Sequence, residues 1–152
     1  MNESKIIEWV MKLPYRWSAG LIGTKFLEGL KNRRILGSKC PKCKRILVPA
    51  RSFCPRCFVD TKDIVEVSDT GILKTFTIIN FKFVGQIKEP PYIVGIIKLD
   101  GADTGFVHFV GGVDLSDVQK AGKELKPGVR VKAVWRKKRN GSILDIKYFK
   151  VI

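Results

Sequence analysis

The chain has 152 residues, of which 45% are hydrophobic and 28% are charged, a composition typical of a globular rather than a disordered protein. Lys and Arg together number 29 against 14 Asp and Glu, a formal net charge of +15 that favours an anionic partner, although a Lys-rich surface of a heat-stable protein gives the same balance. The sequence shows no membrane-spanning run and no secretory signal, so we expect a cytoplasmic protein without a membrane partner.

Two amphipathic helices are expected before the first cysteine. The first covers residues 4–12, and the second follows a cap at Ser18 and runs to about Arg34. Three glycines weaken the second helix but would let another backbone approach it closely. The two helices carry too few apolar residues for a core of their own, so their aromatic side chains must pack on the rest of the chain, on a second copy or on another protein. These side chains are Trp9, Trp17 and Phe26.

The four cysteines of the chain form two C-x-x-C pairs, Cys40 with Cys43 and Cys54 with Cys57. Two intervening residues let both sulfurs of a tight turn face one ion, and two such turns complete the tetrahedral site that Zn²⁺ prefers. Disulfides would suit a secreted chain, and a rubredoxin-like iron site uses the same ligands. Because every cysteine serves as a ligand, no coordination position remains for water or substrate. The pattern therefore predicts a structural zinc ribbon and not a catalytic zinc.

From about residue 63 the sequence has the pattern of strands. Runs rich in β-branched and aromatic residues are separated by turn residues, with a short helix expected between the third and fourth strands and an Asn140-Gly141 hairpin between the last two. The expected strands are Ile72–Phe81, Tyr92–Leu99, Gly105–Val110, Arg130–Lys137 and Ile143–Lys150, and the expected helix is Asp114–Ala121. This order predicts an OB-fold barrel. Gly71 and Gly95 would relieve the strong coiling of so small a barrel.

The predicted fold class is thus mainly β with N-terminal helices, in which a four-cysteine zinc ribbon precedes a five-stranded OB-fold barrel. The predicted division is a helical segment over residues 1–35, the ribbon over 36–62 and the barrel over 63–152.

The ordered motifs resemble those of the acyl-CoA-associated zinc-ribbon and OB-fold proteins known as domain of unknown function thirty-five, over about residues 20–152. The resemblance rests on FLEGL (26–30), LGSKCPKC (36–43), PARSFCPRC (49–57), DTGILKTFT (69–77), PYIV (91–94) and PGVRV (127–131). A four-cysteine ribbon alone occurs in many unrelated proteins, whereas its combination with the following strand motifs is more specific. Many relatives carry Gly where this chain has Ser68.

The resemblance implies a non-catalytic scaffold that sits with an acyl-CoA enzyme such as a thiolase. Relatives in archaea bridge an acetoacetyl-CoA thiolase to a hydroxymethylglutaryl-CoA synthase, and others pair with lipid-transfer-type thiolases, aldolases or hydratases. The family also helps to enclose the pantetheine arm of CoA. An assembly with partner enzymes is therefore expected.

A CoA-binding or partner surface would need cations for phosphate and apolar walls beside them. No acidic residue interrupts the basic segment between residues 31 and 57. The candidate residues for this surface are Arg33, Arg34, Lys44, Arg45, Arg51, Phe53, Phe76 and Tyr92. For each of them, core packing or ordinary solvation is the competing interpretation.

Two other classes of function follow from the residues themselves. An OB barrel with several phenylalanines and the basic run at residues 136–139 could bind single-stranded nucleic acid, provided that surface aromatics and cations alternate on one barrel face. An enzyme would need a nucleophile or a base, but His108 is the single histidine and lies in the middle of a strand. We expect His108 to have a packing or surface role and the protein not to be an enzyme.

Overall fold

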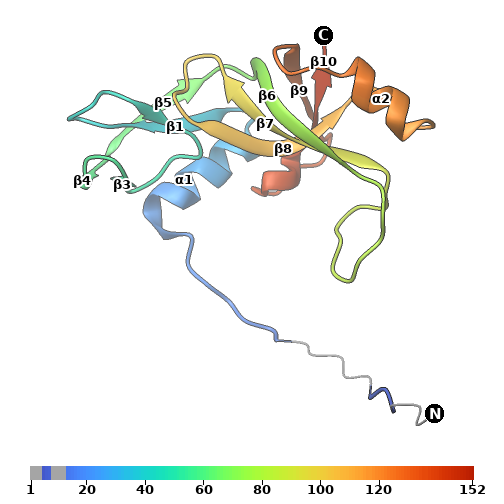
Figure 1. Cartoon of the computed structure of the whole chain (residues 1–152). Coiled ribbons are helices and arrows are strands. Elements are labelled where there is room, and N and C mark those ends of the chain that lie inside the picture. The colour runs from blue at the N-terminus through green and yellow to red at the C-terminus, as the bar shows by residue number, and fades with distance from the viewer. Residues whose placement is uncertain (1–4, 8–12) are drawn as a thin grey trace.

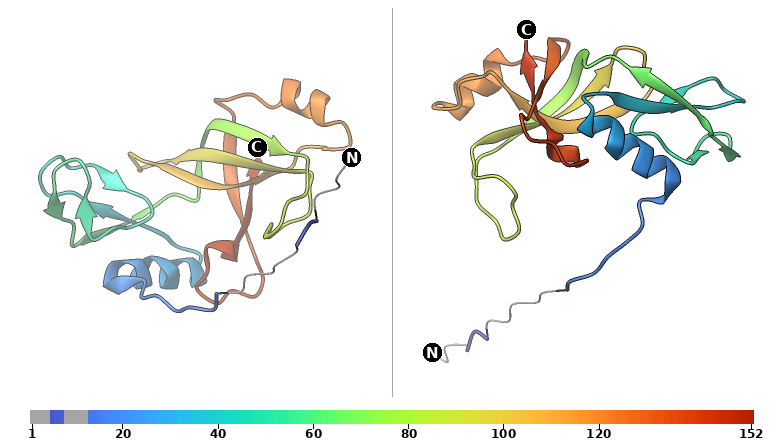
Figure 2. Two further views of the ribbon diagram at one scale, coloured as in Figure 1. Left: turned by 60° about the horizontal axis from the view of Figure 1, so that its bottom comes forward. Right: turned by 180° about the vertical axis from the view of Figure 1, so that it is seen from behind.

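The computed structural model describes residues 5–7 and 13–152, with helix α1 (Gly20–Lys31) next to a ribbon and a closed barrel (Figures 1 and 2). Residues 13–19 extend away from this body, as Figure 1 shows. The helix expected over residues 4–12 falls largely outside the described residues, and its described part, residues 5–7, is neither helix nor strand. No described helix has both the length and the apolar character required to cross a bilayer.

Helix α1 is shorter at both ends than the expected second helix. Ala19 is the N-cap and makes no side-chain capping bond, so the expected cap at Ser18 is wrong; the Ser18 hydroxyl accepts a hydrogen bond from the Gly20 N–H at 3.2 Å instead. At the other end Arg33 adopts a positive φ of 59°, and the Arg34 N–H returns to the carbonyl oxygen of Gly29 at 2.8 Å. This turn ends the helix before Arg34.

Five short strands follow α1 and form two small antiparallel sheets. They are β1 (Ile35–Lys39), β2 (Ile46–Leu47), β3 (Phe53–Cys54), β4 (Val59–Asp60) and β5 (Asp63–Val67). One sheet has the order β2-β1-β5, and the other pairs β3 with β4. Lys39 of β1 lies opposite Ile46 on one side and Asp63 on the other. Strand β5, which begins at Asp63, is hydrogen-bonded to β1 of the ribbon, and the division expected after residue 62 stays a prediction.

The remaining five strands close into a barrel with the order β10-β8-β7-β6-β9. They are β6 (Thr70–Ile79), β7 (Tyr92–Leu99), β8 (Gly105–Gly111), β9 (Arg130–Trp135) and β10 (Ile146–Val151). All neighbouring pairs are antiparallel except β8 with β10, the third and fifth barrel strands, which run parallel. This closed five-stranded arrangement confirms the predicted OB-fold.

Two glycines permit the tight coiling of β6 against its neighbours. A Cβ atom at Gly71 would overlap the Lys98 carbonyl oxygen, and one at Gly95 would lie 2.5 Å from Cδ1 of Leu73. The register between β6 and β7 also shifts between Leu73 and Thr75. These close approaches agree with the role that the sequence analysis expects for Gly71 and Gly95.

The short helix lies further along the chain than expected. Helix α2 covers Val118–Glu124 and not Asp114–Ala121, because Asp117 provides its cap by accepting the Lys120 N–H at 2.9 Å. The Asp114 carboxylate instead accepts the N–H and hydroxyl of Ser116 in the preceding turn.

The last two strands are joined by a loop over residues 136–145 and not by the expected tight hairpin at Asn140-Gly141. The buried Asp145 carboxylate accepts the N–H groups of Asn140, Gly141 and Ser142 at 2.8–3.2 Å. These bonds fold the chain into a wider turn that ends in the 3₁₀ helix η1 (Ile143–Asp145), so β10 begins at Ile146 and not at Ile143.

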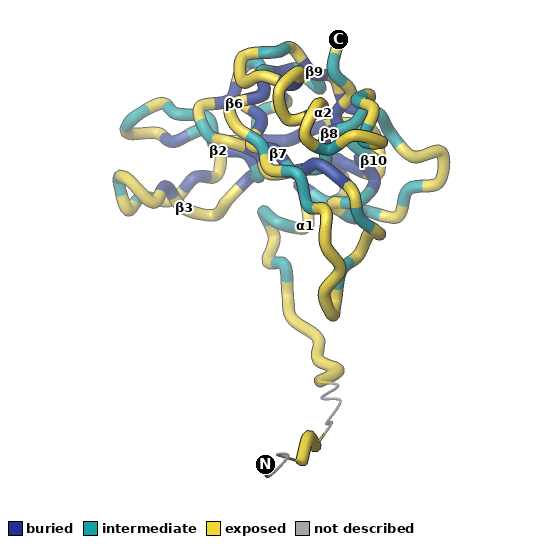
Figure 3. The backbone as a smooth tube through the Cα atoms, turned by 45° about the vertical axis from the view of Figure 1, so that its right-hand side comes forward, coloured by how far each residue is buried: buried dark blue, intermediate teal, exposed yellow. Residues whose placement is uncertain are grey.

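One apolar core joins α1, the base of the ribbon and the barrel (Figure 3). Phe106 packs edge-on against Phe26 of α1 at 6.3 Å and against Phe149 of β10 at 6.1 Å between ring centroids. Phe26 therefore packs within the chain, whereas the Trp17 side chain is 75% exposed. Trp9 lies outside the described residues.

The loop between β7 and β8 also bonds the barrel to the ribbon. The Asp103 carboxylate accepts the Ile46 N–H at 2.9 Å, and the Asp103 N–H donates to the Ile46 carbonyl at 2.8 Å. Next to it the Thr104 hydroxyl accepts the Val48 N–H at 2.7 Å and donates to the Val48 carbonyl at 2.9 Å. The backbone N–H and carbonyl groups of both Ile46 and Val48 thus have partners in this barrel loop.

Candidate functional site

The four cysteines converge at the tip of the ribbon. Cys40 and Cys43 come from the turn between β1 and β2, and Cys54 and Cys57 come from β3 and the turn that follows it. The four sulfur atoms all lie within 4.8 Å of one another, and the Sγ atoms of Cys43 and Cys54 are 3.9 Å apart. Cys40 and Cys54 are fully buried, whereas Cys43 and Cys57 are partly exposed. The predicted metal ligands are therefore brought together.

The two turns have the same backbone geometry, which their shared C-P-x-C sequence explains. In the first turn the Lys44 N–H donates to the Cys40 carbonyl at 3.0 Å, and in the second the Phe58 N–H donates to the Cys54 carbonyl at 2.8 Å. Lys44 and Phe58 both adopt a positive φ, 61° and 53° respectively. In the first turn the Cys43 N–H also points at the Cys40 sulfur, at 3.4 Å. This backbone orients both sulfurs of each pair toward a single point.

The thiols of Cys40 and Cys57 differ in how readily they lose a proton. Burial raises the pKa of Cys40, but hydrogen bonds from the amides of Cys43 and Lys42 and from neighbouring thiols lower it overall to about 6. Burial and then the sulfurs of Cys43, Cys40 and Cys54 raise the pKa of Cys57 to about 12. Four thiolates are thus not tolerated together unless a cation neutralises them.

The donor set fits a tetrahedral metal. A Zn–S distance of about 2.3 Å places the sulfurs of a tetrahedral site about 3.8 Å apart, close to the Cys43–Cys54 separation of 3.9 Å. With four sulfur donors the coordination shell is complete, so the site can hold the two turns together but offers no position for a substrate.

A large groove lies beside the ribbon, between the start of α1 and the chain around β3 and β4. Its volume is about 970 Å³, and it is lined by residues 19–23, Lys25, residues 50–53 and residues 60–62. Of the predicted surface residues, Arg51 and Phe53 belong to this groove. Leu21, Lys25 and Lys62 also line the groove but are not among the predicted surface residues, although Leu21 and Lys25 are four residues apart on one helix and therefore share a face.

The other predicted surface residues lie apart from the groove. The Arg34 guanidinium is paired with Glu66 at 2.7 Å, Lys44 donates to the Pro41 carbonyl at 2.7 Å, and Arg45 donates to the Asp103 carbonyl at 3.0 Å. Arg33 is exposed at the end of α1. The aromatic members Phe76 and Tyr92 belong to the barrel, where Phe76 packs against the core and Tyr92 is buried. The structure does not bring these residues into one surface with Arg51 and Phe53.

His108 has a packing role, in agreement with the expectation. The ring is 5% exposed and lies among Phe106, Phe109 and Phe149, and its Nε2 is 3.0 Å from the Ile143 carbonyl oxygen. Burial lowers the pKa of His108, so the ring is neutral at physiological pH and Nε2 donates this bond. Among the described residues, Nδ1 has no hydrogen-bond partner.

Comparison with known proteins gives two adjoining family matches. Residues 27–63 match the ChsH2 rubredoxin-like zinc ribbon domain, and residues 64–136 match the ChsH2 C-terminal OB-fold domain. A search of curated proteins gives no match.

Two similar solved structures cover most of the chain. A DUF35-family protein of unknown function from Sulfolobus solfataricus is 29% identical over 88% of this chain and 87% of its own, with a TM-score of 0.63. The structure described as Ltp2-ChsH2(DUF35) aldolase is 23% identical over 90% of this chain and 98% of its own, with a TM-score of 0.66. At that identity the second likeness shows the fold alone.

Proposed function

Since the chain belongs to the ChsH2 family, in which a rubredoxin-like zinc ribbon precedes a C-terminal OB-fold domain, we propose that it is a non-catalytic accessory subunit of an acyl-CoA enzyme. The proposed partner is a thiolase, which the subunit bridges to a hydroxymethylglutaryl-CoA synthase, and the subunit helps to enclose the CoA moiety. It acts in the cytoplasm with a structural Zn²⁺ in the ribbon. The relative described as Ltp2-ChsH2(DUF35) aldolase supports a partnership between this family and an enzyme.

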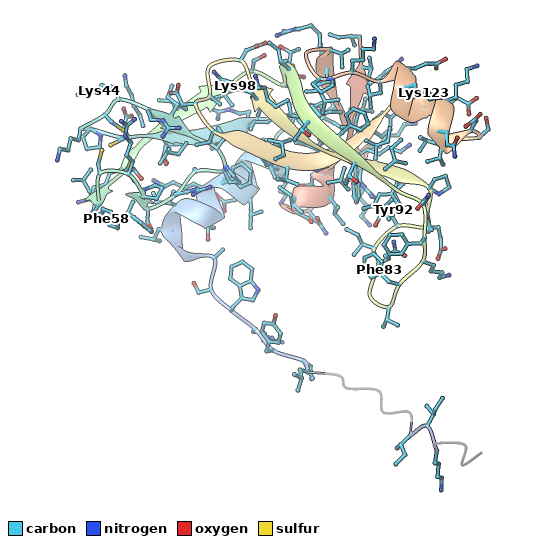
Figure 4. The ribbon with its side chains drawn as sticks, viewed as in Figure 1. Lys44, Phe58, Phe83, Tyr92, Lys98 and Lys123 are labelled. Atoms are coloured by element: carbon cyan, nitrogen blue, oxygen red, sulfur yellow. The ribbon has the colours of Figure 1, made fainter. Side chains whose placement is uncertain are left out.

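The observation that carries this proposal is the apolar surface around the start of α1. Tyr15, Trp17 and Leu21 are 79%, 75% and 85% exposed, and Phe53 across the groove is 49% exposed. Figure 4 shows that residues 13–19, the segment that carries Tyr15 and Trp17, extend away from the body. Several large apolar side chains left exposed near the start of one helix are typical of a protein-binding segment, because burying them in a complex releases ordered water.

The groove beside this surface has the chemistry that a CoA moiety requires. Lys25, Arg51 and Lys62 supply positive charge, with Asp60 the one acidic residue of the lining. Leu21 and Phe53 supply apolar walls. The phosphates of CoA would pair with the cations while its pantetheine arm crosses the apolar walls. The open groove encloses such a ligand only when a partner covers it, which agrees with an accessory role.

The absence of a catalytic role is supported by the residues that could do chemistry. All four cysteines belong to the metal site, and the buried His108 bonds to a backbone carbonyl. Among the described residues no serine or threonine hydroxyl bonds to a histidine. The Thr70 and Ser116 hydroxyls donate to the carboxylates of Asp100 and Asp114. Hydrogen bonds from Arg130 and from Ser116, respectively, lower the pKa of these two carboxyl groups, so both are weak bases at neutral pH.

Affinity purification from the native cells tests the proposal. The tagged protein is isolated after nuclease treatment at about physiological salt, in parallel with a Trp17→Ala/Leu21→Ala variant and with a Lys123→Ala control on α2. We expect an acyl-CoA enzyme to co-purify in fixed ratio with the parent and the control. The double variant should lose it, because both substituted side chains are exposed and contribute little to the fold. Equal recovery of the enzyme with all three proteins, or with none, would overturn the proposal.

A further inference from the structure

The outer face of β7 and β8 is flanked by two loops, residues 80–91 and residues 136–145. On this face Val94 lies opposite Phe109 and Ile96 opposite Val107. The alternate residues of β8, Phe106, His108 and Val110, are buried in the core. In OB-fold barrels the face of the second and third strands, with the loop between strands one and two and the loop between strands four and five, is the surface that binds oligonucleotides and oligosaccharides.

Two adjoining hollows lie on this face and differ in their chemistry. The first, about 180 Å³, is lined mainly by apolar side chains that include Val94, Val107 and Ile143. The second, about 230 Å³, carries three cations, Lys88, Arg136 and Lys147, and no acidic residue. Both hollows share Ile87, Phe109 and Leu144. The cations come from three separate segments of the chain, so the fold and not the sequence brings them together.

Aromatic rings and cations alternate across the second hollow. The Lys88 ammonium lies 5.3 Å from the ring centroid of Phe109 and 5.8 Å from that of Tyr92, and the Lys147 ammonium lies 5.7 Å from that of Tyr148. This alternation is the feature that the sequence analysis required for nucleic-acid binding. It distinguishes the face from a carbohydrate site, which has no need of three uncompensated cations.

The loop over residues 80–91 adds exposed aromatic rings beside the hollows. Phe81 is 64% exposed and Phe83 is 51% exposed, and their ring centroids are 6.0 Å apart. Figure 4 shows Phe83 on this loop, which projects from the barrel near Tyr92. In the opposite loop Lys137 and Lys138 are exposed and extend the positive charge.

From this arrangement we propose that the outer β7–β8 face binds single-stranded nucleic acid. Bases stack on Phe81, Phe83 and the rim of Phe109, while Lys88, Arg136 and Lys147 neutralise phosphates. Each hollow is smaller than the roughly 300–1,000 Å³ of a pocket that encloses a small molecule, whereas a strand that runs along an open face needs no enclosure. A duplex hides its base faces and could not use the exposed rings. The inference goes beyond the accessory role and does not depend on it.

Fluorescence anisotropy with labelled 12-nucleotide oligo-dT and oligo-rU tests this site on the metal-loaded full chain. We expect the Lys88→Ala/Arg136→Ala/Lys147→Ala variant to bind at least tenfold more weakly than the parent. The matched control is Lys42→Ala/Arg56→Ala/Lys123→Ala, which removes the same three charges from exposed positions on the ribbon and on α2, outside both hollows. It should retain most of the affinity. For three neutralised phosphates the slope of log K against log salt should be more negative by about 2 for the parent than for the first variant.

A Phe83→Ala variant separates stacking from charge. It should weaken oligonucleotide binding about tenfold while leaving the salt slope unchanged, since stacking on an aromatic ring contributes to affinity without releasing counterions. Equal losses in the two triple variants would show only a diffuse charge effect and would overturn the site. Absence of binding at low salt, or equal affinity for a 12-base-pair duplex, would overturn it as well.

Discussion

The ribbon tip and the barrel reach stability by different physical routes. Around the metal site the buried cluster consists of Cys40, Leu47 and Cys54, supported by short strands of two residues each. The barrel has strands of six to ten residues and a core that includes the fully buried Phe106 and Phe149. Burial of apolar area can hold the barrel together, whereas the tip has almost none to bury. The comparison indicates that the tip depends on its metal and that the barrel does not.

The largest expected effect comes from removing one metal ligand. A Cys40→Ser variant, or the parent after chelation, should lose the metal and the order of β3 and β4, because metal binding in such a module supplies its folding free energy, about 10–16 kcal/mol in zinc-finger peptides. Metal analysis and amide hydrogen exchange measure this directly. Amides of β3 and β4 should exchange freely while those of β7 and β8 remain protected.

The control is a Ser52→Ala variant. Ser52 is exposed and lies two residues before Cys54, and its substitution leaves all four sulfurs in place. A Cys40→Ser protein with full metal content and unchanged melting temperature would contradict the division between tip and barrel. Loss of protection in β7 and β8 together with the tip would show that the two regions unfold as one unit.

The second largest effect is expected from Thr104, whose hydroxyl joins the barrel to the ribbon. In a Thr104→Val variant the shape of the side chain is nearly kept, but the N–H and carbonyl of Val48 lose the hydroxyl that satisfies both. We expect the free energy of unfolding to fall by about 1–3 kcal/mol, the cost of leaving buried backbone groups unpaired. Urea unfolding measures this loss. Thr104→Ser keeps the hydroxyl and should recover most of it; a serine variant as weak as the valine variant would assign the effect to the methyl group.

Local sequence patterns were sufficient to predict the convergence of the four cysteines and most of the barrel. The two C-x-x-C pairs define their own turns, so the convergence of Cys40, Cys43, Cys54 and Cys57 needs no information from distant residues. Side chains alternate between the two faces of a strand, so the sequence also indicates which residues are buried. Phe106 and His108, two positions apart on β8, both point into the barrel core. In both cases the deciding interactions lie within a few residues.

Features that depend on distant partners could not be predicted in this way. The expected hairpin at Asn140-Gly141 is wrong because the carboxylate of Asp145 competes for its backbone N–H groups. The alignment of β5 with β1 rests on pairs such as Ile35 with Val67, which are far apart in sequence. The grouping of Arg51 and Phe53 with the start of α1 arises in the same way, since tertiary packing alone decides it.

The smallest expected effect concerns the pH dependence of the barrel near its contact with the ribbon. The Asp100 carboxylate accepts two hydrogen bonds from Arg130, at 2.8 and 2.7 Å, and one from the Thr70 hydroxyl at 2.6 Å. Arg130 and then Thr70 lower the pKa of Asp100 to about 2, against about 3.9 in an unfolded chain. The stabilisation is therefore fully present above about pH 4 and is lost as the pH falls toward 2.

An Asp100→Asn variant should be less stable than the parent at pH 7, and the two should converge between about pH 4 and pH 2, where the parent carboxylate becomes protonated. The difference should be small and should shrink in high salt, because the side chains of Arg130 and Asp100 are 45% and 43% exposed. Urea unfolding at a series of pH values measures it. If the unfolding free energies of the parent and the variant instead stay a constant distance apart over that pH range, the Asp100–Arg130 pair stabilises the barrel through its hydrogen bonds and not through its charge. The ion pair would then have no part in the acid sensitivity of the barrel, which would be left to its other carboxylates.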